Sequence, residues 1–223
     1  MFTNREQAGI QLAVALAHYK GRDAVILAVP RGGVPVAYEV AQYLELPMDI
    51  ILTKKIGHPM NKEYAIGAAS MDDYFVIPHE DVSQKYIASE VEDIRSKLKE
   101  SYDKFINNRQ QETLYNKIVI VVDDGIATGN TLLATVNLLK KSHPSKIIIA
   151  TPVASSSGKI KLASVADEVI SLLVPEEFYG VGAFYEDFEQ VSDAEVIYLL
   201  NEIKKGKKLP LPFSDNKKVD RGQ

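Results

Sequence analysis

The chain has 223 residues, of which 46% are hydrophobic and 25% charged, and its formal net charge is −4. This composition is typical of one globular domain, or of a core with a smaller lobe, and it provides enough apolar residues to bury a core. The weak negative charge gives no general indication of binding to nucleic acid or to an acidic membrane. The chain contains no cysteine, which excludes disulfides and thiolate chemistry.

No apolar run approaches the ~20 residues needed to cross a bilayer, and the N-terminus lacks the charged-then-apolar pattern of a signal peptide. We therefore expect a cytoplasmic protein with neither a membrane nor a nucleic acid as its partner. The last twenty residues, from Lys204, hold seven Lys or Arg and two Asp. We predict a domain over residues 1–203 followed by a disordered basic tail over 204–223.

Short β-branched runs alternate with helical patterns, which predicts an α/β fold with a mostly parallel open sheet and flanking helices. The central runs are apolar throughout, as expected for strands covered on both faces. The expected strands are 25–29, 48–53, 118–122, 146–153 and 168–174. The expected helices are 4–19, one opening at 33–35, 131–141, 157–165, and one opening at the capping-box pattern of 192–195.

The stretch between residues 53 and 118 is much longer than the roughly dozen residues that a crossover requires. Residues 64–71 and 74–78 have the pattern of a hairpin around Asp72-Asp73, and 79–112 that of a long, charged, amphipathic helix. We interpret about 57–116 as an inserted lobe.

The strongest functional signal is the apolar run 118–122, followed by Asp123, Asp124 and a loop rich in Gly and Thr that opens a helix. Ligands of open α/β sheets bind at the carboxyl ends of strands, and loop N–H groups beside a helix N-terminus favour phosphate. The two acids would repel a bare phosphate, so they fit ribose hydroxyls, or magnesium reached through its waters. The loop lacks the Gly-Lys-Ser/Thr ending of a nucleoside-triphosphate P-loop.

The string from Val119 to Thr131 resembles the motif with which type I phosphoribosyltransferases bind 5-phosphoribosyl-1-pyrophosphate (PRPP). That motif is an apolar strand, two acids, a small residue, an apolar residue, any residue, then Thr-Gly-x-Thr/Ser. The resemblance covers about residues 20–200 and is nearest to a bacterial branch of the family. It implies that Asp123 and Asp124 hold the ribose hydroxyls. The loop expected to bind the 5-phosphate consists of Gly125, Ile126, Ala127, Thr128, Gly129, Asn130 and Thr131.

A second loop, Pro30-Arg31-Gly32-Gly33, also ends a strand and opens a helix. Arg31 offers a forked cation for phosphate oxygens, while Gly32 and Gly33 let backbone N–H groups approach a ligand. By itself this is a common strand–glycine–helix turn. The family carries a pyrophosphate loop at this place, often with a non-proline cis peptide, and the resemblance implies the same role here, with Pro30–Arg31 as the cis bond.

Lys54 and Lys55 leave the second strand and enter a polar loop over 53–63. Family members carry basic residues here that meet pyrophosphate, followed by a mobile loop that closes over the site and excludes water. The resemblance assigns Lys54 and Lys55 to pyrophosphate, with Lys62 as a weaker candidate. A solvated basic turn is the alternative.

An aromatic, Gly-rich segment follows the last core strand, and the family builds its acceptor-binding hood in this region, here about 175–192. Aromatic faces can stack on a planar base. Phe178 and Tyr179 are therefore the candidates for stacking, and Asp187 is the candidate for meeting the acceptor or the metal. The alternative is that these aromatic residues only cover the edge of the sheet.

The resemblance implies a Mg²⁺-dependent phosphoribosyltransferase of nucleotide metabolism, which moves 5-phosphoribosyl from PRPP to a nitrogenous base and releases pyrophosphate. The candidate catalytic residues are Arg31, Lys54, Asp123 and Asp124. The two aspartates would hold the metal mainly through water and PRPP. Many members carry a catalytic acid or base where this chain has Ala127, which cannot transfer a proton. A non-catalytic PRPP-sensing regulator is the alternative. Dimers are common in the family, so a homodimer is the candidate assembly.

Overall fold

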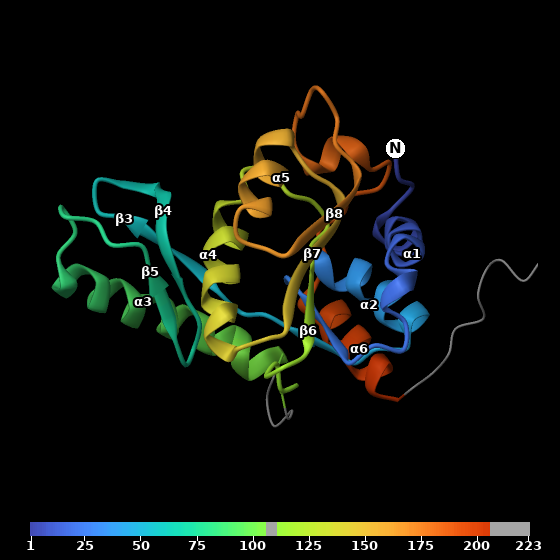
Figure 1. Cartoon of the computed structure of the whole chain (residues 1–223), viewed down its shortest axis with the longest axis horizontal. Coiled ribbons are helices and arrows are strands. Elements are labelled where there is room, and N and C mark those ends of the chain that lie inside the picture. Colours follow the sequence, from blue (N-terminus) through green and yellow to red (C-terminus); the bar gives the residue numbers. More distant parts are fainter. Residues whose placement is uncertain (106–110, 206–223) are drawn as a thin grey trace, which may run out of the picture.

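The structure, a computed structural model, describes residues 1–105 and 111–205. Its centre is a five-stranded sheet in the order β2-β1-β6-β7-β8, and every neighbouring pair is parallel (Figure 1). The strands are β1 (Ala24–Ala28), β2 (Met48–Ile50), β6 (Ile118–Val122), β7 (Lys146–Val153) and β8 (Glu168–Leu173). The predicted parallel α/β fold is confirmed.

Helices cover both faces of this sheet. α1, α2 and α6 pack on one face, and α4 and α5 pack on the other (Figure 1). Their bounds are α1 (Arg5–Ala15), α2 (Gly33–Leu44), α4 (Asn130–Leu139), α5 (Ser156–Ala163) and α6 (Asp193–Lys204). Short 3-10 turns lie at Ala17–Tyr19, Lys140–Ser142 and Val181–Phe184.

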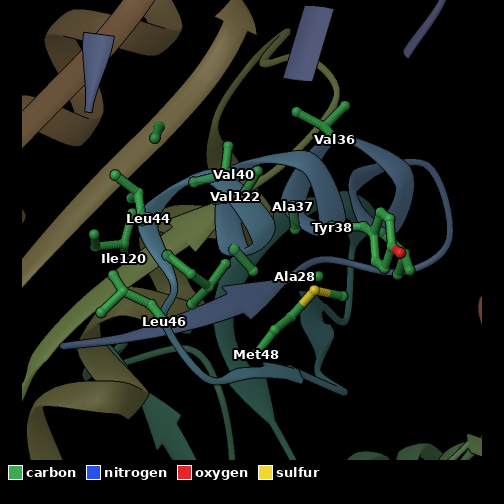
Figure 2. Close-up of a cluster of buried hydrophobic side chains, with 14 of the residues drawn as sticks. Ala28, Val36, Ala37, Tyr38, Val40, Leu44, Leu46, Met48, Ile120 and Val122 are labelled. Atoms are coloured by element: carbon green, nitrogen blue, oxygen red, sulfur yellow. The ribbon is translucent and has the colours of Figure 1, made fainter. Parts of the chain in front are cut away.

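The two-sided covering explains why the central strands are apolar throughout. Alternate residues of a strand point to opposite faces. β1 sends Ile26 and Ala28 into the core under α2, and Val25 and Leu27 into the core under α4. Figure 2 shows the first of these cores, where side chains of α2 lie over those of β1 and β6.

The strand order places both motif loops at one point of the sheet. β1 has β2 on one side and β6 on the other, with Ala28 beside Val122. The carboxyl ends of β1 and β6 therefore mark a topological switch point, where open α/β sheets bind their ligands. The loops that follow Ala28 and Val122 begin side by side at this edge.

The inserted stretch forms a second, smaller layer (Figure 1). β3 (Lys54–His58), β4 (Asn61–Ala69) and β5 (Tyr74–Val76) make an antiparallel sheet, and α3 (Gln84–Phe105) packs against it. The hydrophobic cluster at the centre of this lobe consists of Ile56, Ile66, Ala69, Val82, Ile87, Val91, Ile94 and Leu98. The predicted hairpin is present. The long helix predicted over 79–112 is present over Gln84–Phe105, while 79–83 and 111–112 are not helical.

The polar loop predicted for 53–63 is wrong in its secondary structure. Lys54 and Lys55 open β3, which pairs with β4 along an irregular register. Ile56 is the only apolar residue of the Lys-Lys-Ile-Gly-His run, so the sequence has no alternation that would predict a strand. Pairing with β4 and burial of Ile56 in the lobe stabilise this strand, although its residues have little preference for strand conformation by themselves.

Part of two predictions lies outside the described residues. This holds for 206–223 of the predicted basic tail and for 106–110 of the predicted long helix. In the part of the chain that the structure describes, none of the helices combines the length and the apolar content that a bilayer crossing requires.

The contact between α1 and α2 brings two carboxyl groups together. Glu39 is half-buried on α2 and its Cβ lies close to Gly9 of α1. Burial, and secondarily the charge of Glu6, raises the pKa of Glu39 to about 7. The folded state thus binds this proton more tightly than the unfolded chain, whose pKa is 4.5. The free energy of unfolding therefore falls progressively as pH rises from about 4.5 to about 7.

We predict that Glu39→Gln stabilises the protein at pH 8 and has little effect at pH 4.5, because it removes a charge that folding disfavours. A gain of about 1 kcal/mol is expected at pH 8, since water screens a half-exposed carboxylate. Urea unfolding at both pH values measures it. Glu92→Gln, at an exposed position on α3, controls for the loss of one surface charge. Equal effects of Glu39→Gln at the two pH values would contradict the assignment.

Candidate active site

A cavity of about 510 Å³ opens at the carboxyl ends of β1, β2 and β6. Of the predicted site residues, Arg31, Lys54, Asp123 and Thr131 line it. Its volume lies within the ~300–1,000 Å³ typical of small-molecule sites. Five further polar residues line the cavity and were not predicted from the sequence. They come from the segment between β2 and β3 and from α3, α4 and α6: Thr53, Ser101, Lys104, Thr135 and Asp193. No motif marks them, because the fold alone brings their elements to this edge.

The loops after β1 and β6 touch each other through glycines. A Cβ on Gly33 would lie 2.7 Å from the Val122 carbonyl oxygen, and a Cβ on Gly32 would overlap the Asp124 carboxylate. The backbone thus excludes a side chain at Gly33, and a side chain at Gly32 would have to displace the Asp124 carboxylate. The peptide bond between Pro30 and Arg31 is cis, as the family resemblance implied.

Two helices begin at this edge without a side-chain cap. Neither α2, preceded by Gly32, nor α4, preceded by Gly129, has a capping side chain among the described residues. By contrast Asn4, Ser155 and Ser192 cap α1, α5 and α6. Free N–H groups at a helix N-terminus attract anions. At α2 the amides of Gly33 and Val34 already donate to backbone carbonyls, at 3.0 and 3.1 Å, and the next residue is proline. The start of α4 is therefore the helix end suited to phosphate.

The loop from Gly125 to Thr131 is held in place before any ligand binds. Ile126 N donates to Val153 O at 2.9 Å, and Ser155 N donates to Ile126 O at 2.8 Å. Lys161 Nζ donates to Thr128 O at 3.0 Å. These bonds fix the backbone of the loop, which reduces the entropy that its remaining amides would lose on binding a phosphate.

The paired aspartates have different surroundings. Burial, and then the neighbouring Asp124, raises the pKa of Asp123 well above its ordinary value. Asp124 accepts a hydrogen bond from Arg5 Nε at 2.8 Å, and the two side chains are only 14% and 12% exposed. Arg5 also lies 3.9 Å from the ring centre of Phe188 and donates to Glu189 O at 2.7 Å. Arg5 therefore joins the first helix, the acid pair and the hood.

Of the three candidate lysines, only Lys54 lines the cavity. Lys55 follows it in β3, and adjacent residues of a strand point to opposite faces. Lys62 donates to Glu90 at 2.5 Å and to Tyr86 Oη at 2.8 Å, within the lobe. The assignments of Lys55 and Lys62 to pyrophosphate stay predictions.

The family model described as "Phosphoribosyl transferase domain" matches residues 3–189. The chain belongs to the phosphoribosyl transferase family. The protein TT1426 from Thermus thermophilus matches the structure with a TM-score of 0.86 and 36% identity, over 90% of this chain and 98% of that one.

Two Mycobacterium tuberculosis proteins, MT0597 and Rv0571c, are named as phosphoribosyl transferases. Each is 36% identical to this chain over 206 residues, which are 90% of this chain and 46% of the relative. The chain thus spans about half the length of these curated relatives.

The hood of this phosphoribosyl transferase is docked onto the acid motif. Tyr185 Oη donates to Asp124 O at 2.6 Å, and burial raises the pKa of Tyr185. Phe2 N donates to Phe184 O at 2.8 Å, and Glu186 N donates to Phe2 O at 2.8 Å. Gly125 packs directly against Val181.

The three predicted acceptor residues lie on this hood and outside the lining of the cavity. Phe178 stacks on Phe184 with ring centres 5.6 Å apart. Tyr179 is 79% exposed and donates to Glu177. Asp187 accepts a hydrogen bond from Glu189 N at 3.1 Å. Of the two aromatic candidates, Tyr179 is thus the one whose ring faces solvent.

The acid pair fits a metal ion that arrives with a phosphorylated substrate. Within residues 1–105 and 111–205, no three His, Cys, Asp or Glu side chains gather closely enough to hold a metal by themselves. Magnesium is commonly bound by one or two carboxylates together with water and substrate phosphates. Asp123 lines the cavity, and Asp124, the next residue, is not part of the lining and has its carboxylate paired with Arg5.

We predict that Arg5→Met lowers the free energy of unfolding by about 1–3 kcal/mol, because it leaves the Asp124 carboxylate largely buried without its cation. Asp124→Asn should be less costly, and the double variant should recover part of the loss. Urea unfolding of the four proteins gives the coupling energy directly. Additive effects of the two substitutions would show that the ion pair carries no interaction energy.

Proposed function

We propose that this domain transfers the 5-phosphoribosyl group of PRPP to a nitrogenous base and releases pyrophosphate. The composition of the cavity carries the proposal. Arg31 and Lys54 supply positive charge, while Asp123 and Thr131 supply a carboxyl and a hydroxyl group. PRPP presents the matching chemistry: a pyrophosphate, a ribose diol and a 5-phosphate. Membership of the phosphoribosyl transferase family supports the same conclusion.

In the proposed complex the substrate lies across the switch point. The pyrophosphate binds Arg31, Lys54 and the amide of Gly32, since the Gly33 amide already donates to Val29 O at 3.0 Å. The ribose hydroxyls bind Asp123 and Asp124. The 5-phosphate binds the loop 125–131 through amides other than that of Ile126, which is used by Val153 O. The uncapped start of α4 supports this orientation, because this helix follows directly on the loop proposed for the 5-phosphate.

Catalysis in this proposal comes from positioning and electrostatics. As the bond from C1 to pyrophosphate lengthens, Arg31 and Lys54 stabilise the charge that builds up on the leaving group. The acid pair stabilises the positive charge on the ribosyl group, and the base attacks from the opposite face. Holding two substrates in register can supply roughly 7–11 kcal/mol. No covalent enzyme intermediate is needed.

Magnesium would be held by PRPP, with Asp123 and Asp124 contacting it mainly through water. When bound, it supplies further neutralisation of the pyrophosphate charge. The acceptor would enter from the hood, where Tyr179 offers an exposed ring for stacking, and Phe178 and Asp187 line the same segment.

A non-catalytic PRPP sensor is the second candidate, and Ala127 favours it. An alanine at this exposed loop position cannot exchange a proton with the acceptor. A base that is already a good nucleophile would not need that help, so turnover decides between the two functions.

We predict base-dependent release of pyrophosphate when the protein is incubated with PRPP, Mg²⁺ and a panel of purines, pyrimidines and other heteroaromatic bases. A coupled pyrophosphate assay measures it. PRPP binding without release across the panel would favour the sensor. Absence of PRPP binding would contradict both functions.

We predict that the double variant Asp123→Asn, Asp124→Asn weakens PRPP binding at least 100-fold, because amides donate where the ribose hydroxyls need acceptors. Calorimetric titration measures the affinity, and circular dichroism checks the fold. The single variant Asp123→Asn keeps the Arg5–Asp124 pair and should weaken binding about tenfold, the loss expected for one hydrogen bond to a charged group. Asp93→Asn, at an exposed position on α3, is the control. Unchanged affinity in the folded double variant would refute the assignment of the acid pair.

A further inference from the structure

Asp193 lies between two cations on the wall of the cavity. Arg31 Nη1 donates to Asp193 Oδ1 at 3.2 Å, and Lys104 Nζ donates to Asp193 Oδ2 at 3.1 Å. The three residues come from the loop after β1, the last turn of α3 and the first turn of α6. All three line the cavity of about 510 Å³.

The inserted lobe thereby reaches the site. Besides Lys104, the end of α3 contributes Leu98, Ser101 and Phe105 to the cavity wall. Among the described residues, the charged part of the lining consists of three cations, Arg31, Lys54 and Lys104, and two acids, Asp123 and Asp193. Each cation that faces a bound polyanion raises the affinity of the cavity for it, and each carboxylate that faces the polyanion lowers that affinity.

A carboxylate shared by an arginine and a lysine occupies the place that a phosphoryl oxygen would take, since both anions suit the same donors. The Asp193 side chain is 37% exposed, that of Arg31 41% and that of Lys104 53%. Ion pairs as exposed as these hold weakly and are screened by salt. A pyrophosphate group carries more charge than one carboxylate and is therefore able to displace it.

We propose that Lys104 of the inserted lobe binds the pyrophosphate of the substrate, and that Asp193 is an internal counter-ion that competes with pyrophosphate for Arg31 and Lys104. This proposal rests on the proposed function, in which PRPP occupies this cavity. It gives the lobe a direct part in binding, and it makes the affinity for pyrophosphate adjustable through one carboxylate.

A purely structural role for the same ion pairs predicts a different outcome. If Asp193 only fastened α3 and the loop after β1 to α6, its removal would loosen the cavity and weaken binding. Competition predicts that removal of Asp193 strengthens binding and that removal of Lys104 weakens it. Opposite signs for the two variants are therefore the signature of the counter-ion. Asp193→Asn should fold, because the cap of α6 is Ser192, which accepts from Glu195 N at 3.1 Å.

The test is calorimetric titration of the full chain with inorganic pyrophosphate and Mg²⁺, and separately with PRPP and Mg²⁺. For both ligands Lys104→Gln should weaken binding about fivefold to tenfold, and Asp193→Asn should tighten it about threefold or more. Lys99→Gln removes a lysine from an exposed position of the same helix, outside the cavity lining, and should change affinity less than twofold. Thermal unfolding confirms that each variant is folded.

The outcomes separate this inference from the proposed function. If the unmodified protein binds PRPP but Lys104→Gln behaves like Lys99→Gln, or Asp193→Asn weakens binding, the counter-ion proposal is overturned and the proposed function stands. If it binds pyrophosphate with the expected pattern but not PRPP, the pyrophosphate subsite stands and the PRPP assignment fails. Binding of neither ligand overturns both.

Discussion

The contact between the loops after β1 and β6 is the constraint on which the rest of the site depends. Gly33 lies against the carbonyl of Val122, which leaves no room for a side chain, and Gly32 lies against the Asp124 carboxylate, which any side chain there would displace. The contact exists because β1 and β6 are neighbours at the point where the strand order reverses. It brings the proposed pyrophosphate loop and the acid pair within the span of one small ligand. A sheet with any strand between these two would separate them.

Elements far apart in the sequence hold this contact from outside. Arg5 of the first helix donates to the Asp124 carboxylate, and Tyr185 of the hood donates to the backbone carbonyl of the same residue. On the other side, the inserted lobe sends Lys104 to the cavity wall, and α6 sends Asp193 to meet it. The acid pair is thus enclosed by charges of both signs. Its own electrostatics follow from this enclosure, since burial and the neighbouring carboxylate raise the pKa of Asp123.

The sequence predicted those features that local pattern determines. The apolar run 118–122 predicted a strand, and the acids and the Gly/Thr loop after it predicted a ligand-binding edge of the sheet and the start of a helix. All three signals lie within one continuous segment. Lys54 was predicted near pyrophosphate, but in a loop, whereas it opens β3. The run has no alternation of apolar and polar residues, and the residue pattern does not reveal its pairing with β4. Arg5, Lys104 and Asp193 were not predicted at all. Each is an ordinary charged residue of an amphipathic helix, and only tertiary packing gives it a position at the site.

The most direct test of the account is a crystal structure of the protein with Mg²⁺ and a non-reactive PRPP analogue. The account predicts one ligand lying across the carboxyl ends of β1 and β6. Its pyrophosphate should contact Arg31 and Lys54, its ribose hydroxyls the acid pair, and its 5-phosphate the loop 125–131. A ligand bound elsewhere on the molecule, or bound here with the ribose hydroxyls turned away from Asp123 and Asp124, would contradict it.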